Sequence, residues 1–197
     1  MNIRINGNDI DYQLDREETL GQILGVLEHE CEKNGMTITS ISVDGEAFHS
    51  ADLDGLFSRS PDDVTTLDLE TMSGPDIVAI IHRIGERMAA HAESLIEIPV
   101  LLQTGEDSRV MESIHSFAED FESLCQSLPL MKTISERDVA AVLVEDIPLE
   151  QYPSRLTPML GELIEAIKSN DTVLIGDISE YELAPKLQSL ASVLATV

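Results

Sequence analysis

The residues best placed for metal chemistry in this sequence are two Glu-x-x-His pairs, Glu112–His115 and Glu46–His49. Carboxylate-bridged di-iron bundles combine such pairs with further Glu residues from facing helices. Only the first pair falls on an expected helix, so the second helical copy is missing. His82 and His91 are nine residues apart, about 180° around a straight helix, and cannot share one metal. We therefore expect no metal site.

No signature of a known catalytic site accompanies these residues. The sequence lacks a Cys-x-x-Cys, a His-Glu-x-x-His, a phosphate-binding glycine loop and a Gly-x-Ser-x-Gly elbow. We expect no catalytic residues, no cofactor and no enzymatic activity. An enzyme that uses scattered carboxylates, such as Asp177 and Glu180 with His82, stays an alternative.

The acid with the most unusual surroundings is Asp177, which interrupts the apolar run 172–178. Tyr181 follows it by one helical turn. An acid in such a run is either an anchor that faces a partner or a buried polar site, unless it simply lies on the solvated side of its helix. If Asp177 is buried, one of few cations must neutralise it, and the candidates are Arg87, Arg155 and Lys186.

The charge of the chain restricts its partners. There are 37 acidic and 12 basic residues, a formal net charge of −25, and they are spread along the chain without a long acidic run. Such a field repels nucleic-acid phosphates and anionic lipids. We therefore expect no nucleic acid or membrane partner, but another protein with a basic surface. The charge also favours solubility, and homo-oligomerisation stays open.

The two cysteines and the N-terminal residues indicate the compartment. Cys31 and Cys125 each fall on the apolar side of an expected helix, which predicts buried, reduced thiols. The first residues lack the apolar core of a signal peptide, and no apolar run approaches the length of a membrane span. These features predict a cytoplasmic protein.

Residues 1–72 have the pattern of a small mixed α/β module. Strand-like alternation flanks one amphipathic helix, and Asn-Gly and Asp-Gly pairs mark tight turns. The expected elements are strands at 2–6 and 9–14, a helix over 18–34 that Gly35 ends, a strand at 36–43 with an irregularity at 39–40, a short helical turn at 53–57 and a strand at 64–71.

This order of elements resembles the β-grasp, or ubiquitin-like, fold. The resemblance rests on the Ile3/Ile5 and Ile10/Tyr12/Leu14 hairpin, the helix and the two later strands. Modifier and sulfur-carrier members end in a free Gly-Gly tail, whereas here Gly74 precedes Pro75 and the chain continues. The resemblance therefore implies a recognition or scaffold module without carrier chemistry.

Residues 74–197 have apolar positions at helical spacing and predict an antiparallel helical bundle. The expected helices are one from Pro75 that Ile98-Pro99 ends or kinks, one over 110–128, a short one at 139–144, one over 158–167 and one over 171–194 with a kink or break before Pro185. The β-branched residues of 139–144 would also suit a strand, but Ala140-Ala141 favours a helix.

The fold class is therefore α+β, with a β-grasp-like module at 1–72 and a helical bundle at 74–197. The function that fits best is a non-catalytic adaptor or scaffold of the bacterial cytoplasm that binds another protein. The alternative is a chaperone for an exported or flagellar subunit, with a binding groove on the apolar faces of Met88, Met111, Met131 and Met159.

Overall fold

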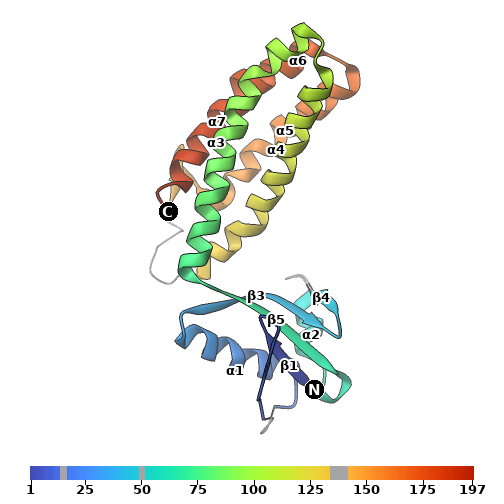
Figure 1. The fold of residues 1–197 in the computed structure, drawn as a ribbon, viewed down its shortest axis with the longest axis vertical. Coiled ribbons are helices and arrows are strands. Elements are labelled where there is room, and N and C mark those ends of the chain that lie inside the picture. The colour runs from blue at the N-terminus through green and yellow to red at the C-terminus, as the bar shows by residue number, and fades with distance from the viewer. Residues whose placement is uncertain (14–16, 49–51, 134–141) are drawn as a thin grey trace. The chain divides into compact units, whose positions relative to one another are not determined.

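A computed structural model describes residues 1–13, 17–48, 52–133 and 142–197. A strand-rich segment is followed by a helical one (Figure 1). The chain divides into two compact units, Met1–Asp76 and Ile77–Val197. The expected α+β class, a sheet module followed by an antiparallel helical bundle, is confirmed.

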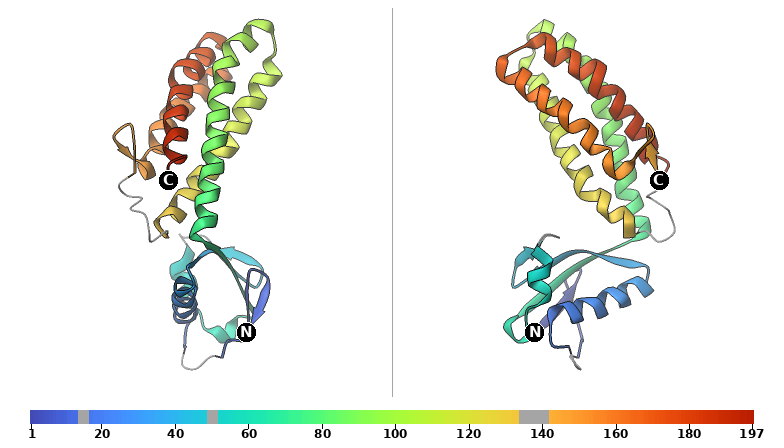
Figure 2. Two further views of the ribbon diagram at one scale, coloured as in Figure 1. Left: turned by 60° about the vertical axis from the view of Figure 1, so that its left-hand side comes forward. Right: turned by 180° about the vertical axis from the view of Figure 1, so that it is seen from behind.

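The first unit is a mixed five-stranded sheet with helices on one side (Figure 2). Its strands are β1 (Asn2–Ile5), β2 (Asn8–Ile10), β3 (Met36–Val43), β4 (Glu46–Phe48) and β5 (Thr66–Ser73). They lie in the order β2-β1-β5-β3-β4, with β1 parallel to β5 and all other pairs antiparallel. The helices are α1 (Leu20–Lys33), α2 (Leu53–Phe57) and the 3₁₀ turn η2 (Pro61–Asp63).

Two tight turns set the hairpins of this sheet. Asn6 and Gly7 both have positive φ between β1 and β2, and Asp44 and Gly45 both have positive φ between β3 and β4. Positive φ at both central residues is the type I′ geometry, whose twist matches paired strands. The second turn leads into β4, a strand that the sequence analysis did not predict.

The predicted irregularity in β3 is confirmed, because the register of β3 against β5 shifts between Ile38 and Ser40. The apolar residues of the strands and of α1 then meet in one core. Its buried members are Ile3, Leu20, Ile23, Leu24, Leu27, Val43, Leu56, Val64, Leu67 and Leu69.

The second part of the chain is an antiparallel bundle, in which α3 and α4 run in opposite directions, as do α5 and α7 (Figure 1). The long helices are α3 (Gly74–Thr104), α4 (Asp107–Ser127), α5 (Pro153–Ser169) and a final run of α6 (Thr172–Asp177), the π-helix η6 (Ile178–Leu183) and α7 (Ala184–Leu194). Shorter elements are the 3₁₀ helices η3 (Leu128–Thr133) and η5 (Leu149–Gln151) and the strands β6 (Leu143–Val144) and β7 (Ile147–Pro148).

The sequence predicted that Ile98-Pro99 ends or kinks the first long helix of the bundle, and the structure shows that it does not end α3. The helix continues through Pro99 to Thr104. Pro99 costs one backbone hydrogen bond, but Leu95, Ile98 and Leu101 around it are all buried, and this packing holds the helix together. Helix α5 similarly starts at Pro153, before the expected 158, because proline suits the first turn of a helix.

The prediction of a helix at 139–144 is wrong where the structure describes it. Residues 139–141 lie outside the described residues, and Leu143–Val144 is a strand paired with Ile147–Pro148. Glu145 and Asp146 both have positive φ, the tight-turn geometry of a hairpin. The hairpin therefore decides the structure at this point, and the strand alternative was the correct one for Leu143–Val144.

The irregularity expected before Pro185 is a π-helix. The backbone N–H of Ala184 donates to the carbonyl oxygen of Ser179, five residues back. In a regular α-helix the ring of Pro185 would press against the carbonyl of Tyr181. The wider π turn relieves that contact, and the chain continues as helix on both sides.

The sulfur-containing residues divide between core and surface. Met88 and Met131 are fully buried, whereas Met111 is 47% exposed. Cys31 is half-buried and Cys125 is exposed, so the prediction of a buried thiol is wrong for Cys125, at the end of α4. None of the described helices combines the length and apolar character needed to cross a bilayer.

Candidate functional site

The candidate site is a groove between the C-terminal half of α3 and the α6–η6 segment. Gly176 of α6 packs against Pro99 of α3, and a Cβ atom on Gly176 would lie 3.4 Å from Pro99 Cγ, an ordinary van der Waals contact. The two helices therefore converge at this contact, which brings their exposed faces together.

The groove has a volume of about 350 Å³. It is lined by residues from both segments: Pro99, Leu102 and Gln103 from α3, and Thr172, Val173, Gly176, Asp177, Glu180 and Tyr181 from α6–η6. A hollow of this size accepts one or two large side chains rather than a folded domain.

Several exposed apolar side chains lie in this groove or near it on α3. Among the large hydrophobic residues of the described chain, Val173 (71%), Tyr181 (67%) and Val100 (61%) are the three most exposed. Val173 and Tyr181 line the groove, and Val100 lies one turn from Gln103 on α3. Ile96, which precedes Val100 by one turn on the same helix face, is 42% exposed. Apolar surface that gathers at a hollow is typical of interaction sites.

Carboxylates supply the polar part of the groove. Asp177 and Glu180 both line it, and no ion pair of the described chain neutralises either. A hydrogen bond to the Glu180 carboxylate raises the pKa of the Tyr181 phenol, and the charges of Glu180 and Asp177 raise that pKa further. The phenol therefore stays neutral at physiological pH, and the rim is negatively charged.

The structure thus brings together the two residues that the sequence singled out. Asp177 is exposed rather than buried, and Tyr181 lies beside it in the groove. The cations proposed for a buried Asp177 are not required, and two of them pair elsewhere, Arg87 with Asp120 and Lys186 with Glu145.

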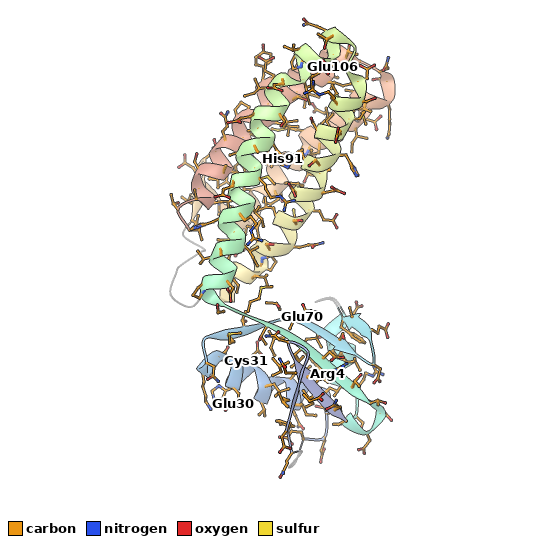
Figure 3. The ribbon with its side chains drawn as sticks, viewed as in Figure 1. Arg4, Glu30, Cys31, Glu70, His91 and Glu106 are labelled. Carbon is orange, nitrogen blue, oxygen red and sulfur yellow. The ribbon has the colours of Figure 1, made fainter. Side chains whose placement is uncertain are left out.

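Among the described residues of the helical unit, the buried acid is Asp120, which was not predicted from the sequence. Asp120 is 5% exposed and His91 is 9% exposed, and His91 Nε2 lies 2.6 Å from Asp120 Oδ2. Arg87 Nε donates to the same Oδ2 atom at 2.8 Å. Figure 3 marks His91 on α3, and the ring of Phe117 on α4 meets its imidazole edge-on at a centroid distance of 5.8 Å.

Asp120 could have been recognised from its spacing. It follows Phe117 by three residues and precedes Leu124 by four, and both are fully buried, so it occupies a core position of α4. Burial lowers the pKa of His91, and the neighbouring Arg87 charge lowers it further. The imidazole is therefore neutral and donates its Nε2 proton to Asp120, whose charge Arg87 compensates. This arrangement joins α3 to α4.

The other residues considered for chemistry do not gather. Glu112 and His115 are both exposed on α4, and His115 Nε2 lies 3.4 Å from Glu119 rather than near Glu112. Glu46 lies in β4, and His49 is outside the described residues. Within the described ranges no three His, Cys, Asp or Glu residues are placed to hold a metal ion.

His82 does not join the carboxylates of the groove either. It is exposed on α3, and seventeen residues separate it from Pro99, about 25 Å along a helix. The combination of Asp177, Glu180 and His82 in one catalytic site is therefore not present in the described structure.

The exposed Cys125 lies beside a smaller hollow of about 260 Å³, which Leu128, Pro129, Glu150 and Pro153 also line. Partial burial raises the pKa of the Cys125 thiol. The side chain is therefore largely a thiol rather than a nucleophilic thiolate near neutral pH.

These features define an α+β protein whose helical part carries an acidic and apolar groove. Comparison with known proteins places the chain in a family. The model described as "Domain of unknown function (DUF8042)" matches residues 80–193, more than half of the chain, and that described as "TP0873 N-terminal domain" matches residues 1–73. The chain therefore belongs to the DUF8042 family.

One relative matches nearly the whole chain. An uncharacterized protein of Treponema pallidum (strain Nichols) is 35% identical over 195 residues, which cover 97% of this chain and 94% of the relative. No solved structure matches the chain significantly.

Proposed function

We propose that this chain is a non-catalytic protein-interaction protein, an adaptor or scaffold, and that the groove between α3 and α6–η6 is its main binding site. One observation carries the proposal: the two most exposed large apolar side chains of the described chain, Val173 and Tyr181, both line this groove. Leaving such residues in water is unfavourable, and covering them with a partner contributes binding energy.

The first unit supports the same reading. Its strand order β2-β1-β5-β3-β4, with α1 against the sheet, is consistent with the resemblance to β-grasp domains. We propose that this unit is a β-grasp-like recognition or scaffold module. Its edge strands β2 and β4 offer backbone groups to which an extended segment could pair.

The π-helix at the groove adds to this proposal. π turns inside α-helices occur frequently at functional sites, and here the π turn holds Glu180 and Tyr181 at the rim. Among the residues that the structure describes, neither carboxylate is paired with a cation, and the Tyr181 phenol bonds only to its neighbour Glu180, so these groups are suited to contact with another molecule.

The test is quantitative affinity capture from the source organism with the full chain. Three baits are compared: the natural sequence, a groove variant with Val173→Ser and Tyr181→Ser, and a control variant with Met111→Ser and Ile164→Ser. The control residues are also exposed apolar side chains, at 47% and 51%, but lie on α4 and α5 outside the groove lining.

We expect a protein that the natural and control baits retain and that the groove variant loses by about tenfold, equivalent to 1.4 kcal/mol. If the lost protein is a single exported subunit, the chaperone alternative replaces the adaptor. The proposal is wrong if the groove variant and the control variant retain the same proteins in the same amounts.

A further inference from the structure

The walls of the groove indicate what kind of segment it accepts. Both walls are helical, so most backbone N–H and C=O groups there are paired within α3 and α6–η6, apart from the N–H groups in the first turn of α6 and the carbonyl that Pro99 leaves without a donor. An extended peptide would find no strand edge to pair with, and its own backbone groups would lose water without replacement. A helix satisfies its backbone internally and buries only side chains.

The charge of the rim indicates the composition of that helix. Asp177 and Glu180 lie beside Val173 and Tyr181, and no lysine, arginine or histidine in the described ranges forms an ion pair with them. A lysine or arginine on the incoming helix can pair with them while its apolar neighbours cover Pro99 and Val173. The net charge of −25 also attracts a basic segment from a distance.

The same charge disfavours a second copy of this chain as the occupant. A symmetric contact through this groove would bring Asp177 and Glu180 of one copy against those of the other, because a two-fold interface uses the same patch on both subunits. Like charges at such a contact oppose association.

We propose that the groove between α3 and α6–η6 binds a basic amphipathic helix of another protein, with an apolar side chain seated over the Pro99–Gly176 contact and cations against Asp177 and Glu180. This inference rests on the proposed function and specifies the chemistry of the partner. The apolar positions of the helix recur at three- and four-residue spacing, as in other helix-in-groove complexes.

Synthetic peptides test the proposal on the full-length chain. Three probes share one length: an amphipathic helix of leucine and lysine, the same pattern with glutamate in place of lysine, and a serine–lysine peptide with the charge but no apolar face. Fluorescence anisotropy gives the affinities, and amide chemical shifts of the isotope-labelled protein locate the binding site.

We expect the leucine–lysine helix to bind at least about tenfold more tightly than either other peptide, which is 1.4 kcal/mol or more. The largest shifts should fall at residues 96–103 and 172–181. Asp177→Asn with Glu180→Gln should weaken binding about threefold or more, because two rim charges are lost. The control Glu119→Gln with Glu122→Gln removes the same charge from α4 and should leave the affinity nearly unchanged.

Three results would overturn the inference: shifts spread over other surfaces, equal weakening by the groove and control pairs, or tighter binding of the glutamate peptide. The capture experiment separates this failure from that of the proposed function. If capture depends on the groove but the leucine–lysine helix does not bind there, the function stands and the chemistry of the partner is wrong. If the helix binds there but capture is independent of the groove, the proposed function is wrong.

Discussion

Removing the buried carboxylate of Asp120 by Asp120→Ala is expected to lower the free energy of unfolding of the helical unit by about 1–4 kcal/mol. The His91 side chain is 11% exposed, so its Nε2–H would be left buried without its acceptor, at a cost of about 1–3 kcal/mol. The Arg87 side chain is 52% exposed and can turn to water, so losing its pair costs at most about 1 kcal/mol. The hydrogen bond to His91 therefore dominates the expected loss.

Urea unfolding followed by far-ultraviolet circular dichroism measures this loss, since the chain has no Trp and its helices dominate the signal. Asp120→Asn is the matched control. An amide oxygen can still accept the His91 proton, so this variant should lose less stability than Asp120→Ala. Arg87→Met should lose about 1 kcal/mol or less.

Two outcomes would contradict the reasoning. If Asp120→Ala loses less than about 0.5 kcal/mol, the range of an ordinary surface substitution, then His91 does not depend on Asp120. If Arg87→Met costs as much as Asp120→Ala, then the ion pair rather than the hydrogen bond to His91 stabilises the contact between α3 and α4.

Further substitutions test other parts of the structure. The pKa of His91 is lower in the folded chain than in the unfolded chain, so the unfolded chain takes up the proton first as the pH drops. The free energy of unfolding should therefore fall below about pH 6.5. Urea unfolding at several pH values should show a weaker dependence of this free energy on pH for His91→Gln than for the natural sequence. Gly21→Ala should destabilise by about 1–3 kcal/mol in urea unfolding, because the new Cβ would lie 2.9 Å from Phe57 Cβ. At Gly25 a new Cβ would meet no atom within 4 Å, so Gly25→Ala should raise the free energy of unfolding by up to about 1 kcal/mol. Equal changes for Gly21→Ala and Gly25→Ala would show that the contact with Phe57 does not limit residue 21. Asp171 Oδ1 accepts a hydrogen bond from the backbone N–H of Leu174 at 3.0 Å. Asp171→Ala should therefore lower the free energy of unfolding by about 1 kcal/mol and with it the midpoint of thermal unfolding. An unchanged midpoint would show that this cap does not stabilise the helix.

The features that local chemistry controls could be predicted. Gly35 has the expected positive φ at the end of α1, and Asp171 caps α6. The alternation of β3 and its irregularity between Ile38 and Ser40 are also confirmed. In each case the determining residues are a few positions apart in the chain, so turn geometry, capping and periodicity decide the structure before any tertiary contact forms.

Predictions failed where packing or strand pairing outweighs the helical preference of individual residues. The end of α3 at Pro99 was one of two expected outcomes, and the burial of Leu95, Ile98 and Leu101 carries the helix past it. At Leu143–Val144 the pairing with Ile147–Pro148 overrides the helical signal of the nearby alanines. Local propensity is a weak preference that such tertiary contacts readily override.

The sequence alone determined the α+β class, the excess of acidic charge and the interest of Asp177 and Tyr181. Only the tertiary structure decided that Asp177 is exposed at a groove while Asp120 is the buried acid. The partners that make the difference are far apart in the chain: His91 and Asp120 are 29 positions apart, and Pro99 and Gly176 are 77 positions apart. Whether a polar side chain is buried depends on which helix faces meet, and periodicity within one helix does not contain that information.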